Sequence, residues 1–426
     1  MAILSHISVE ALIHRCLGSC GLQDPKAHGH TSPRKPLNPS VVAFEKYIQN
    51  NSEIVKLCHS MFIETKHLVD AKRAHASYLV INDIPTLIGL LDFLLTHTPR
   101  WAEAESPSET ITWSPFHHLL LIFLETPSGE RLFLRNEVNR HLKAILHEWT
   151  SFLDTPDSRA ALNSQTGWLS PGAISQLEHA ANTPTGHRRP FTEIFECPDE
   201  TDGEFLGFAS WNTFVTRRFN PTIRPLPSPQ DLPRDCAPVL NPCESTPWQI
   251  SRQCQLRDRF WLKSQPYSIR DMLDNDARAE SFANGTVYQG SLSTLDYHRW
   301  HAPVDGTVRG VRWVEGAYFT RPDEKNGVAL DGMHSFLMTV AARLVIFIEA
   351  ADPRIGLIAF VGVGLCDTDI QEGDYLEGGQ DIGTFRLGKV TYCLIFCEHV
   401  NLQFVSLVDG ERKGSNIPVR SLLAWC

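Results

Sequence analysis

Long helical stripes of apolar residues belong to the first 185 residues of this chain, which limits the folds that it can adopt. The clearest stripe covers residues 132–153, where apolar side chains recur at spacings of three and four, as on one face of an α-helix. Further helices are expected at residues 41–61, with a break at 50–52, and at 84–95, 115–124 and 172–181, the last with Ser170 as N-cap and Pro171 in its first turn. Residues 41–185 are therefore predicted to form a helical domain. They follow an irregular arm, residues 1–40, with one short helix near residues 9–17.

Beyond residue 185 the pattern changes to short β-rich runs separated by turns, after prolines that cluster between positions 221 and 247. Strands are expected at residues 306–314, 336–350, 355–364 and 387–396, and a short helix at 267–273 with Ser268 as its N-cap. Short strands at close spacing favour antiparallel pairing. The prediction is an α+β fold, in which the helical domain is followed by an antiparallel β-rich domain, residues 186–426.

Charge and hydropathy exclude several classes of protein. The net charge is −10 and the basic residues form no stripe, so a nucleic-acid partner is not expected. No run approaches the ~18–20 uncharged apolar residues of a membrane-spanning helix, which argues against stable membrane insertion. His6, Glu10 and His14 interrupt the apolar core that a signal peptide would need, and the expected location is the cytoplasm.

The eleven cysteines are odd in number and are not spaced as metal ligands. Cys393 and Cys397 fall in an apolar run, where a strand would place both on one face. Cysteine packs as a small apolar residue in reducing compartments, so free buried thiols are expected and a metal site is not.

Residues 297–308 contain the strongest candidate for chemistry. His298 and His301 lie three residues apart, and Pro303 and the Asp305-Gly306 pair follow as turn formers. At a strand end that breaks into a turn, both imidazoles can converge on one pocket, and histidine exchanges a proton near neutral pH. The alternative is a hydrogen-bonded structural pair.

Six separated segments occur in the order in which they occur in one known family: residues 167–169, 208–219, 242–245, 267–273, 297–308 and 381–388. On these segments the chain resembles the phosphatidylserine decarboxylase family over residues 35–426. Its likeness is greatest to the branch that includes the fungal tryptophan decarboxylase of psilocybin biosynthesis, which implies a decarboxylase-like domain at residues 186–426 and a role in fungal secondary metabolism.

The resemblance also implies a site. In that family an acid, a histidine and a serine form a triad. The serine attacks the preceding peptide bond, the chain splits, and the new N-terminus becomes a pyruvoyl group that serves as the electron sink for decarboxylation. By position, Glu244 matches the triad acid, His301 matches the triad base, and His298 matches a histidine implicated in proton transfer.

The serine of that triad is missing here. Depending on the form of the motif that is aligned, its place is taken by Lys389 or by Val390, and neither has a hydroxyl. Thr391 follows one or two places later, and a one-place shift in a strand turns a side chain to the other face. The expectation is therefore a chain that does not cleave itself, has no pyruvoyl group and needs no cofactor. The short acidic segment 366–374 replaces a longer stretch of the family and suggests a changed substrate.

Three kinds of chemistry remain open. Lys389 could form a Schiff base with a keto acid in a lyase or condensing enzyme, with Glu244 orienting one of the histidine rings. The same residues could instead carry out acid–base isomerisation, cyclisation or hydrolysis, with Lys389 holding an anion. The third possibility is a non-catalytic relative that binds a small molecule. Gly388 and Phe385 are expected to line the substrate site.

The expected partner is a small amino-acid-derived or keto acid, and the chain could form a homo-oligomer. A phospholipid substrate is less favoured, because no amphipathic membrane anchor is visible.

Overall fold

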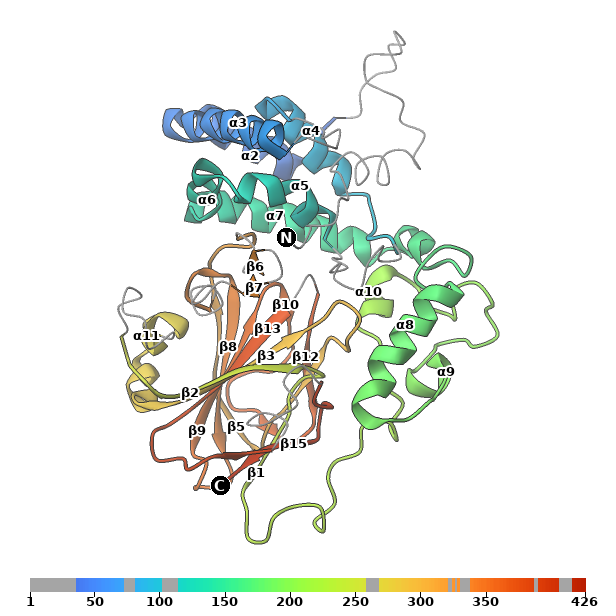
Figure 1. The fold of residues 1–426 in the computed structure, drawn as a ribbon, viewed down its shortest axis with the longest axis vertical. Helices are drawn as coiled ribbons and strands as arrows, with labels where there is room; N and C mark the ends of the chain where they lie inside the picture. The colour runs from blue at the N-terminus through green and yellow to red at the C-terminus, as the bar shows by residue number, and fades with distance from the viewer. Residues whose placement is uncertain are drawn as a thin grey trace. The chain divides into compact units, whose positions relative to one another are not determined.

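The computed structural model describes residues 36–72, 81–101, 114–257, 268–320, 324–325, 328–329, 338–386, 390–405 and 416–426. The chain groups into two compact units (Figure 1). One comprises residues 1–99, 104–152 and 317–330, and the other comprises residues 100–103, 153–316 and 331–426. Because spatial grouping does not test where an independently folding domain ends, the predicted boundaries at 40/41 and 185/186 stay predictions.

The first unit is helical. Its elements are α2 (Pro39–Gln49), α3 (Ser52–Lys72), α4 (Ile84–Leu94), α5 (Pro115–Leu124), α6 (Pro127–Phe133) and α7 (Asn136–Leu153), whose last residue falls in the second unit. Four of these helices begin in the same way, with a polar N-cap followed by a first-turn proline. The caps are Asn38, Asp83, Ser114 and Thr126, and each accepts a hydrogen bond from a first-turn backbone N–H.

The predicted helices at 84–95 and 115–124 are confirmed, as is the break at 50–52. The single helix expected at 132–153 is wrong at its start, because Leu132 lies in α6, which ends at Phe133, and α7 covers Asn136–Leu153. The Asn139 side-chain amide donates to the carbonyls of Phe133 (2.6 Å) and Arg135 (2.9 Å), so it satisfies backbone groups where the two helices meet. The spacing of apolar residues continues unchanged from one helix to the next, so the sequence pattern gave no sign of the break. The helix expected near residues 9–17 lies outside the described residues.

The second unit is built on a seven-stranded antiparallel sheet in the order β11-β5-β8-β9-β13-β3-β2. The strands are β11 (Tyr375–Leu376), β5 (Gly306–Val314), β8 (Arg343–Ala350), β9 (Leu357–Val363), β13 (Val390–Phe396), β3 (Gly285–Leu292) and β2 (Thr246–Cys254). Strands β8, β9, β13 and β3 are almost continuously buried, because both faces of the sheet are covered. They form the core of this unit.

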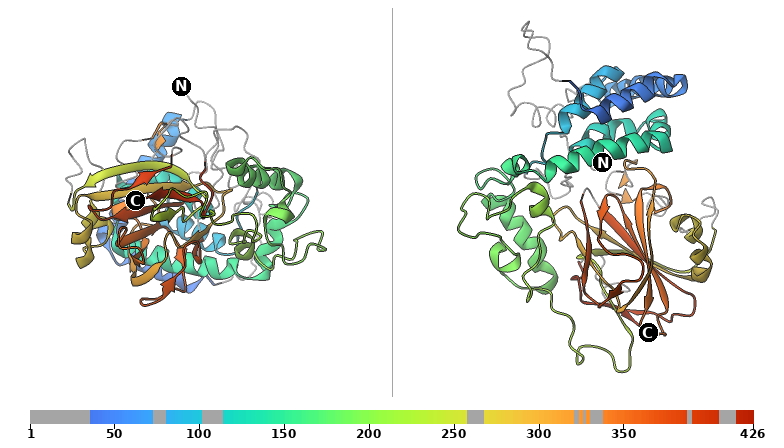
Figure 2. Two further views of the ribbon diagram at one scale, coloured as in Figure 1. Left: turned by 90° about the horizontal axis from the view of Figure 1, so that it is seen from below. Right: turned by 180° about the vertical axis from the view of Figure 1, so that it is seen from behind.

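Two smaller sheets accompany the large one. The first has the order β10-β12-β4, with β10 (Cys366–Asp367), β12 (Asp381–Phe385) and β4 (Arg299–His301). The second has the order β1-β15-β14, with β1 (Pro238–Leu240), β15 (Leu422–Trp425) and β14 (Gln403–Phe404); its strand β15 ends close to the C-terminus (Figure 2). Strands β6 (Glu324–Lys325) and β7 (Val328–Ala329) pair separately and belong to the first unit.

The second unit also contains helical segments. They are η2 (Pro156–Leu162), α8 (Pro171–Asn182), η3 (Thr183–Thr185), α9 (Phe191–Ile194), α10 (Trp211–Val215), α11 (Ile269–Met272) and η4 (Ala277–Phe282). Trp168 and Trp211 are fully buried against each other, with ring centroids 5.3 Å apart. This cluster fixes the segment that follows α10.

The antiparallel β-rich prediction is confirmed, and β5 has the predicted bounds. Strand β8 begins later than expected, because Met338–Val340 form a helical turn. Ser170 and Ser268 stand at the predicted N-cap positions of α8 and α11, although their side chains make no capping bond there. The nine described cysteines are free, and Cys393 and Cys397 are both buried as predicted.

Candidate active site

The two predicted histidines lie where the small sheet β10-β12-β4 begins. His301 ends β4, and its Cα is paired with that of Asp381 on β12. The carbonyl of His298 accepts the backbone N–H of Phe385 at 2.8 Å. The backbone N–H of His301 donates to the carbonyl of Pro242 at 2.8 Å, which brings the segment of Glu244 to the same place. The structure thus joins parts of the chain more than fifty residues apart.

The hydrogen bonds of His301 define its tautomer. Nδ1 lies 2.8 Å from the carbonyl of Gly379, and because a carbonyl only accepts, Nδ1 carries the proton. Nε2 lies 3.2 Å from the hydroxyl of Tyr297 and accepts from it in the neutral ring. Burial lowers the pKa of His301, so the ring is neutral at pH 7. Its Nε2 is the nitrogen that can take up a proton.

His298 has the same tautomer for the same reason. Its Nδ1 donates to the carbonyl of Asp296 at 2.8 Å, which leaves Nε2 as the basic nitrogen. The ring is fully buried, and burial lowers the pKa of His298 to about 3, with the positive charge of Arg217 acting in the same direction. Both rings are therefore oriented by backbone carbonyls.

Glu244 is buried in an ion pair with Arg224. Nε of Arg224 donates to Oε2 at 3.0 Å and Nη2 donates to Oε1 at 2.5 Å, and the backbone N–H of Val419 donates to Oε2 at 2.8 Å. The guanidinium also donates to the carbonyl of Ala181 at the end of α8 (2.7 Å). Glu244 is therefore held by a cation and an amide, not by the ring bond expected from the sequence.

A series of stacked groups connects Glu244 to His301. The Arg224 guanidinium lies 4.6 Å from the ring centroid of Phe219. The Phe219 ring stacks on Tyr297 at 4.2 Å, and Tyr297 in turn stacks on His301 at 5.9 Å. A shift of the Glu244–Arg224 pair would therefore move Phe219 and Tyr297, and the hydroxyl of Tyr297 faces Nε2 of His301.

Asp296 adds a buried carboxyl that sequence reasoning missed. Its oxygens accept from the backbone N–H of Ser293 (2.6 Å) and from the side-chain amide of Asn416 (2.8 Å). Burial raises the pKa of Asp296 to about 7, and the negative charge of Glu244 contributes in the same direction. This group is poised to exchange a proton near neutral pH.

A second buried network surrounds Ser245, next to Glu244. Its hydroxyl lies 2.9 Å from the hydroxyl of Tyr392, which donates to the side-chain carbonyl of Asn241 at 2.8 Å. Tyr392 lies on β13, opposite Gly290 and Gly362, and a side chain at Gly290 would collide with its ring. The glycine thus makes room for the phenol that faces the Glu244 segment.

The remaining predicted residues fall around a short undescribed segment. Phe385 is fully buried and stacks on Trp300, with ring centroids 5.3 Å apart. Lys389 and Gly388 lie outside the described residues, which end at Arg386 and resume at Val390. Phe385 contacts His298 through its backbone, and Val390 pairs with Leu292, one residue before Ser293. The described residues on either side of this segment therefore lie beside the histidines and Asp296.

Other residues of the site were also missed. Tyr297 is the first residue of the histidine stretch and could have been predicted from the sequence. A tyrosine four residues before a histidine can reach the imidazole with its hydroxyl. Arg224 stands among prolines with no local signal, since only the fold brings it to Glu244. Within the described ranges, no group of three or more His, Cys, Asp or Glu side chains could hold a metal ion, and no helix could cross a membrane.

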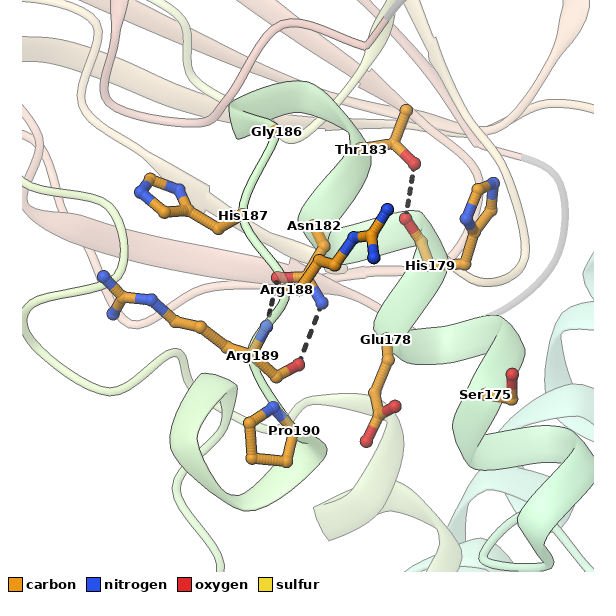
Figure 3. A pocket seen from close by; sticks show the side chains of 10 residues that line it. All are labelled: Ser175, Glu178, His179, Asn182, Thr183, Gly186, His187, Arg188, Arg189 and Pro190. Atoms are coloured by element: carbon orange, nitrogen blue, oxygen red, sulfur yellow. Dashed lines mark hydrogen bonds between the residues drawn. The ribbon is translucent and has the colours of Figure 1, made fainter.

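A separate surface cavity of about 580 Å³ lies at the end of α8 (Figure 3). Its lining includes His179, His187, Arg188 and Arg189, with the Asn182 amide bonded to the backbone of Arg189. Glu178 accepts the backbone N–H of Phe191 at 2.8 Å. None of the predicted site residues lines this cavity, which is open to solvent, so we do not assign the chemistry to it.

Comparison with known proteins gives a consistent result. Residues 38–177 and 211–409 match two family models, both described as phosphatidylserine decarboxylase. The chain is 35% identical over 327 residues to Decarboxylase iboD of Amanita muscaria, covering 72% of this chain and 89% of that protein. It is 30% identical to the L-tryptophan decarboxylase of Psilocybe cubensis, with 66% and 67% covered. Phosphatidylserine decarboxylase proenzyme 2 of Oryza sativa is 28% identical over 48% of this chain and 32% of its own length.

Proposed function

Because the chain belongs to the phosphatidylserine decarboxylase family, and is thus an enzyme of a family of lyases, we propose that it is an uncleaved, pyruvoyl-free decarboxylase-like enzyme acting on a small amino-acid-derived or keto acid. The proposal rests on two observations taken together. Glu244, His298 and His301 are each buried, and a backbone hydrogen bond from His301 to Pro242 joins their segments. The position of the self-cleaving serine holds Lys389 or Val390. The acid–base groups of the family remain and its nucleophile does not.

The described residues do not fit the formation of a pyruvoyl group. Val390 is buried and apolar. The nearest hydroxyl on the strand belongs to Thr391, and it donates to the carbonyl of Gly290 at 2.9 Å and accepts from the side-chain amide of Gln289 at 3.0 Å. Thr391 also alternates with Tyr392, whose phenol faces Ser245, so the threonine points to the opposite face of the sheet. This supports a chain that stays in one piece.

We propose that the amine of Lys389 takes the place of the missing pyruvoyl carbonyl. The neighbour of Lys389 in sequence, Val390, is described, and the Cα of Val390 is paired with that of Leu292, in the segment that leads to Asp296. A lysine amine that is buried loses solvation, which lowers its pKa and makes it nucleophilic, and this is the state that the proposal requires of Lys389. The proposal places this amine in reach of the two histidines.

The reaction then proceeds with the enzyme supplying the amine. The lysine amine adds to the ketone of a β-keto acid and water leaves, which forms an iminium. The bond to the carboxyl carbon breaks and carbon dioxide leaves. The electron pair of the broken bond moves into the iminium and gives an enamine. Protonation of the enamine carbon and addition of water release the ketone and restore the amine.

The histidines supply the proton transfers in this scheme. Both rings are neutral with the proton on Nδ1. Nε2 of one ring can accept the proton that the amine loses as it adds to the carbonyl and return it to the hydroxyl group that leaves as water. The same nitrogen can then pass a proton from solvent to the enamine carbon. Tyr297 donates to Nε2 of His301 and can relay the proton. The Glu244–Arg224 pair holds the stack that positions Tyr297. Glu244 is thus proposed to act through position and charge.

Asp296 favours a second candidate, an acid–base isomerase, cyclase or hydrolase without a covalent intermediate. A carboxyl with a pKa of about 7 can act as general acid and as general base at neutral pH. In that case Lys389 would only hold the negative charge of a substrate.

Two measurements on the purified chain test these readings. The first follows release of ¹³CO₂ from carboxyl-labelled β-keto acids and amino acids, including L-tryptophan. The second records intact mass after borohydride reduction in the presence of each compound that is turned over. We expect carbon dioxide release and a reduced adduct that is lost in Lys389→Ala. The adduct should be kept in Lys46→Ala, a control at an exposed position of α2. Release without an adduct would mean decarboxylation without a lysine Schiff base, and no release from any compound would contradict the decarboxylase proposal.

A further inference from the structure

Arg217 is a buried cation, and one edge of its guanidinium has no hydrogen-bond partner in the described part of the chain. It lies two residues beyond α10, and only 3% of its surface is exposed. Its Nη1 donates to the carbonyl of Phe214 at 3.2 Å, whereas Nε and Nη2 are buried and have no hydrogen-bond partner among the described residues. We propose that Arg217 binds the carboxylate of the substrate through these two groups.

The pair of free donors determines the ligand chemistry. Nε and Nη2 form one edge of the guanidinium and point in parallel, which matches the two oxygens of a carboxylate. The chain contains its own example, because Arg224 uses the same two atoms to hold the two oxygens of Glu244. A buried polar group without a partner costs free energy, so Arg217 is held ready for a partner that the described protein does not supply.

Aromatic rings keep the guanidinium in place. Its central carbon lies 4.3 Å from the ring centroid of Phe195, 5.0 Å from that of Phe214 and 5.9 Å from that of Phe191. Cation–π contacts offset part of the cost of burying the charge and leave the hydrogen-bonding edge unused. Burial lowers the pKa of Arg217 only to about 10, so the side chain remains charged at neutral pH.

Arg217 belongs to the same buried region as the predicted catalytic groups. Its charge acts on His298, and the ionised forms of Tyr297 and Asp296 act on it in turn. The Phe195 ring that packs against the guanidinium stacks on Phe219, and Phe219 stacks on Tyr297, the residue next to His298. A carboxylate bound there would therefore lie near the histidine segment. For a decarboxylating enzyme this edge would hold the carboxyl group before it leaves, and for an acid–base enzyme it would orient the substrate. The identity of the ligand as substrate rests on the proposed function, whereas carboxylate binding does not.

The test uses sodium formate, the smallest carboxylate, against sodium chloride at equal ionic strength. Formate binding is followed by the unfolding temperature and by the side-chain Nε–H resonances of ¹⁵Nε-arginine-labelled protein. We expect formate to stabilise the wild-type chain and to shift one resonance, which is absent in Arg217→Lys. In Arg217→Lys the apparent Kd for formate should rise at least about tenfold, or 1.4 kcal/mol, because lysine lacks the parallel donors.

Arg218→Gln is the matched control. Arg218 is the neighbouring arginine, its side chain is 59% exposed, and it lies 3.5 Å from Asp381. This variant loses one positive charge from the same segment and should bind formate as the wild type does. Equal formate binding in wild type and Arg217→Lys, or no binding in either, would overturn the proposal.

A crystal structure of the wild-type chain in formate provides the test without a variant, in case Arg217→Lys does not fold. Formate on the Nε–Nη2 edge is the expected result, and an edge without formate at saturating concentration contradicts it. The carbon dioxide and borohydride measurements use neither formate nor these variants. Failure of the decarboxylase proposal and failure of this one are therefore distinguishable.

Discussion

Arg224 and Glu244 form a two-point ion pair in the interior, with Nε to Oε2 at 3.0 Å and Nη2 to Oε1 at 2.5 Å. Their side chains are 5% and 2% exposed. Two charges so deeply buried are costly to desolvate, and the pair repays that cost only while both partners are present. The pair is therefore a sensitive point in the stability of the second unit.

Replacing Arg224 should destabilise the protein strongly. Arg224→Ala leaves the Glu244 carboxylate buried with only the Val419 amide, and it also removes the bond to Ala181 and the contact with Phe219. The expected loss is about 3–5 kcal/mol in the free energy of unfolding, measured by urea titration.

A double variant separates the charge effect from packing. Arg224→Leu combined with Glu244→Leu removes both charges and should cost less than Arg224→Leu alone. Arg140→Ala on α7, whose pair with Glu137 is exposed, is the control and should change little. An Arg224→Ala protein as stable as the wild type would show that the buried pair contributes nothing.

The purified chain should migrate as one band in denaturing gel electrophoresis, near its mass of 47.9 kDa. The reason is chemical, because neither Lys389 nor Val390 can attack the preceding carbonyl through a hydroxyl. A small C-terminal fragment that begins at residues 389–391 and resists Edman sequencing would contradict this. If such a fragment appeared, its disappearance in Thr391→Val would identify Thr391 as the nucleophile.

The sequence was sufficient where local patterns determine structure. Strand β5 and helix α5 have the predicted bounds, because the turn residue Asp305 and the N-cap residue Ser114 directly precede regular apolar patterns. The break between α6 and α7 escaped prediction, since both helices continue one apolar spacing.

The candidate site divides in the same way. His298 and His301 could be found because they are adjacent in sequence and lie in a recognisable stretch. The partnership of Glu244 with Arg224 could not, because twenty residues and several prolines separate them. The raised pKa of Asp296 depends on burial and on the charge of Glu244, which only the folded chain specifies.

Asp296 should make stability depend on pH in an unusual direction. Its pKa is about 7 in the folded chain and near 3.9 when unfolded, so the folded state binds the extra proton between these values. Stability from this group is therefore complete below about pH 4 and is lost as pH rises to about 7, at up to about 1.4 kcal/mol per pH unit. Asp296→Asn should remove this slope in urea titrations run from pH 4 to 8.

His298 should act in the opposite direction. Its pKa falls from about 6.5 in the unfolded chain to about 3 in the folded chain, so the unfolded state binds the extra proton in that range. The wild type should lose stability relative to His298→Gln as pH falls from 6.5 towards 3. The contributions of Asp296 and His298 to the pH dependence of stability partly cancel below pH 6.5. The contribution of each residue is therefore measured as the difference in stability between the wild type and the variant of that residue. A pH-independent difference for His298→Gln would indicate that the ring is not buried in the neutral form.

Substitution of Lys389 separates the possible chemistries. Lys389→Arg keeps the positive charge but cannot form an imine, because the guanidinium stays protonated. If Lys389 forms a Schiff base, kcat/KM for carbon dioxide release should fall by orders of magnitude in both Lys389→Arg and Lys389→Ala. If it only holds an anion, Lys389→Arg should keep much of the rate and Lys389→Ala should lose it. Glu244→Gln serves as the comparison, because it changes the buried ion pair and leaves the amine intact. Full activity in all three variants would mean that neither Lys389 nor Glu244 takes part in the reaction, and it would overturn the role proposed for both residues.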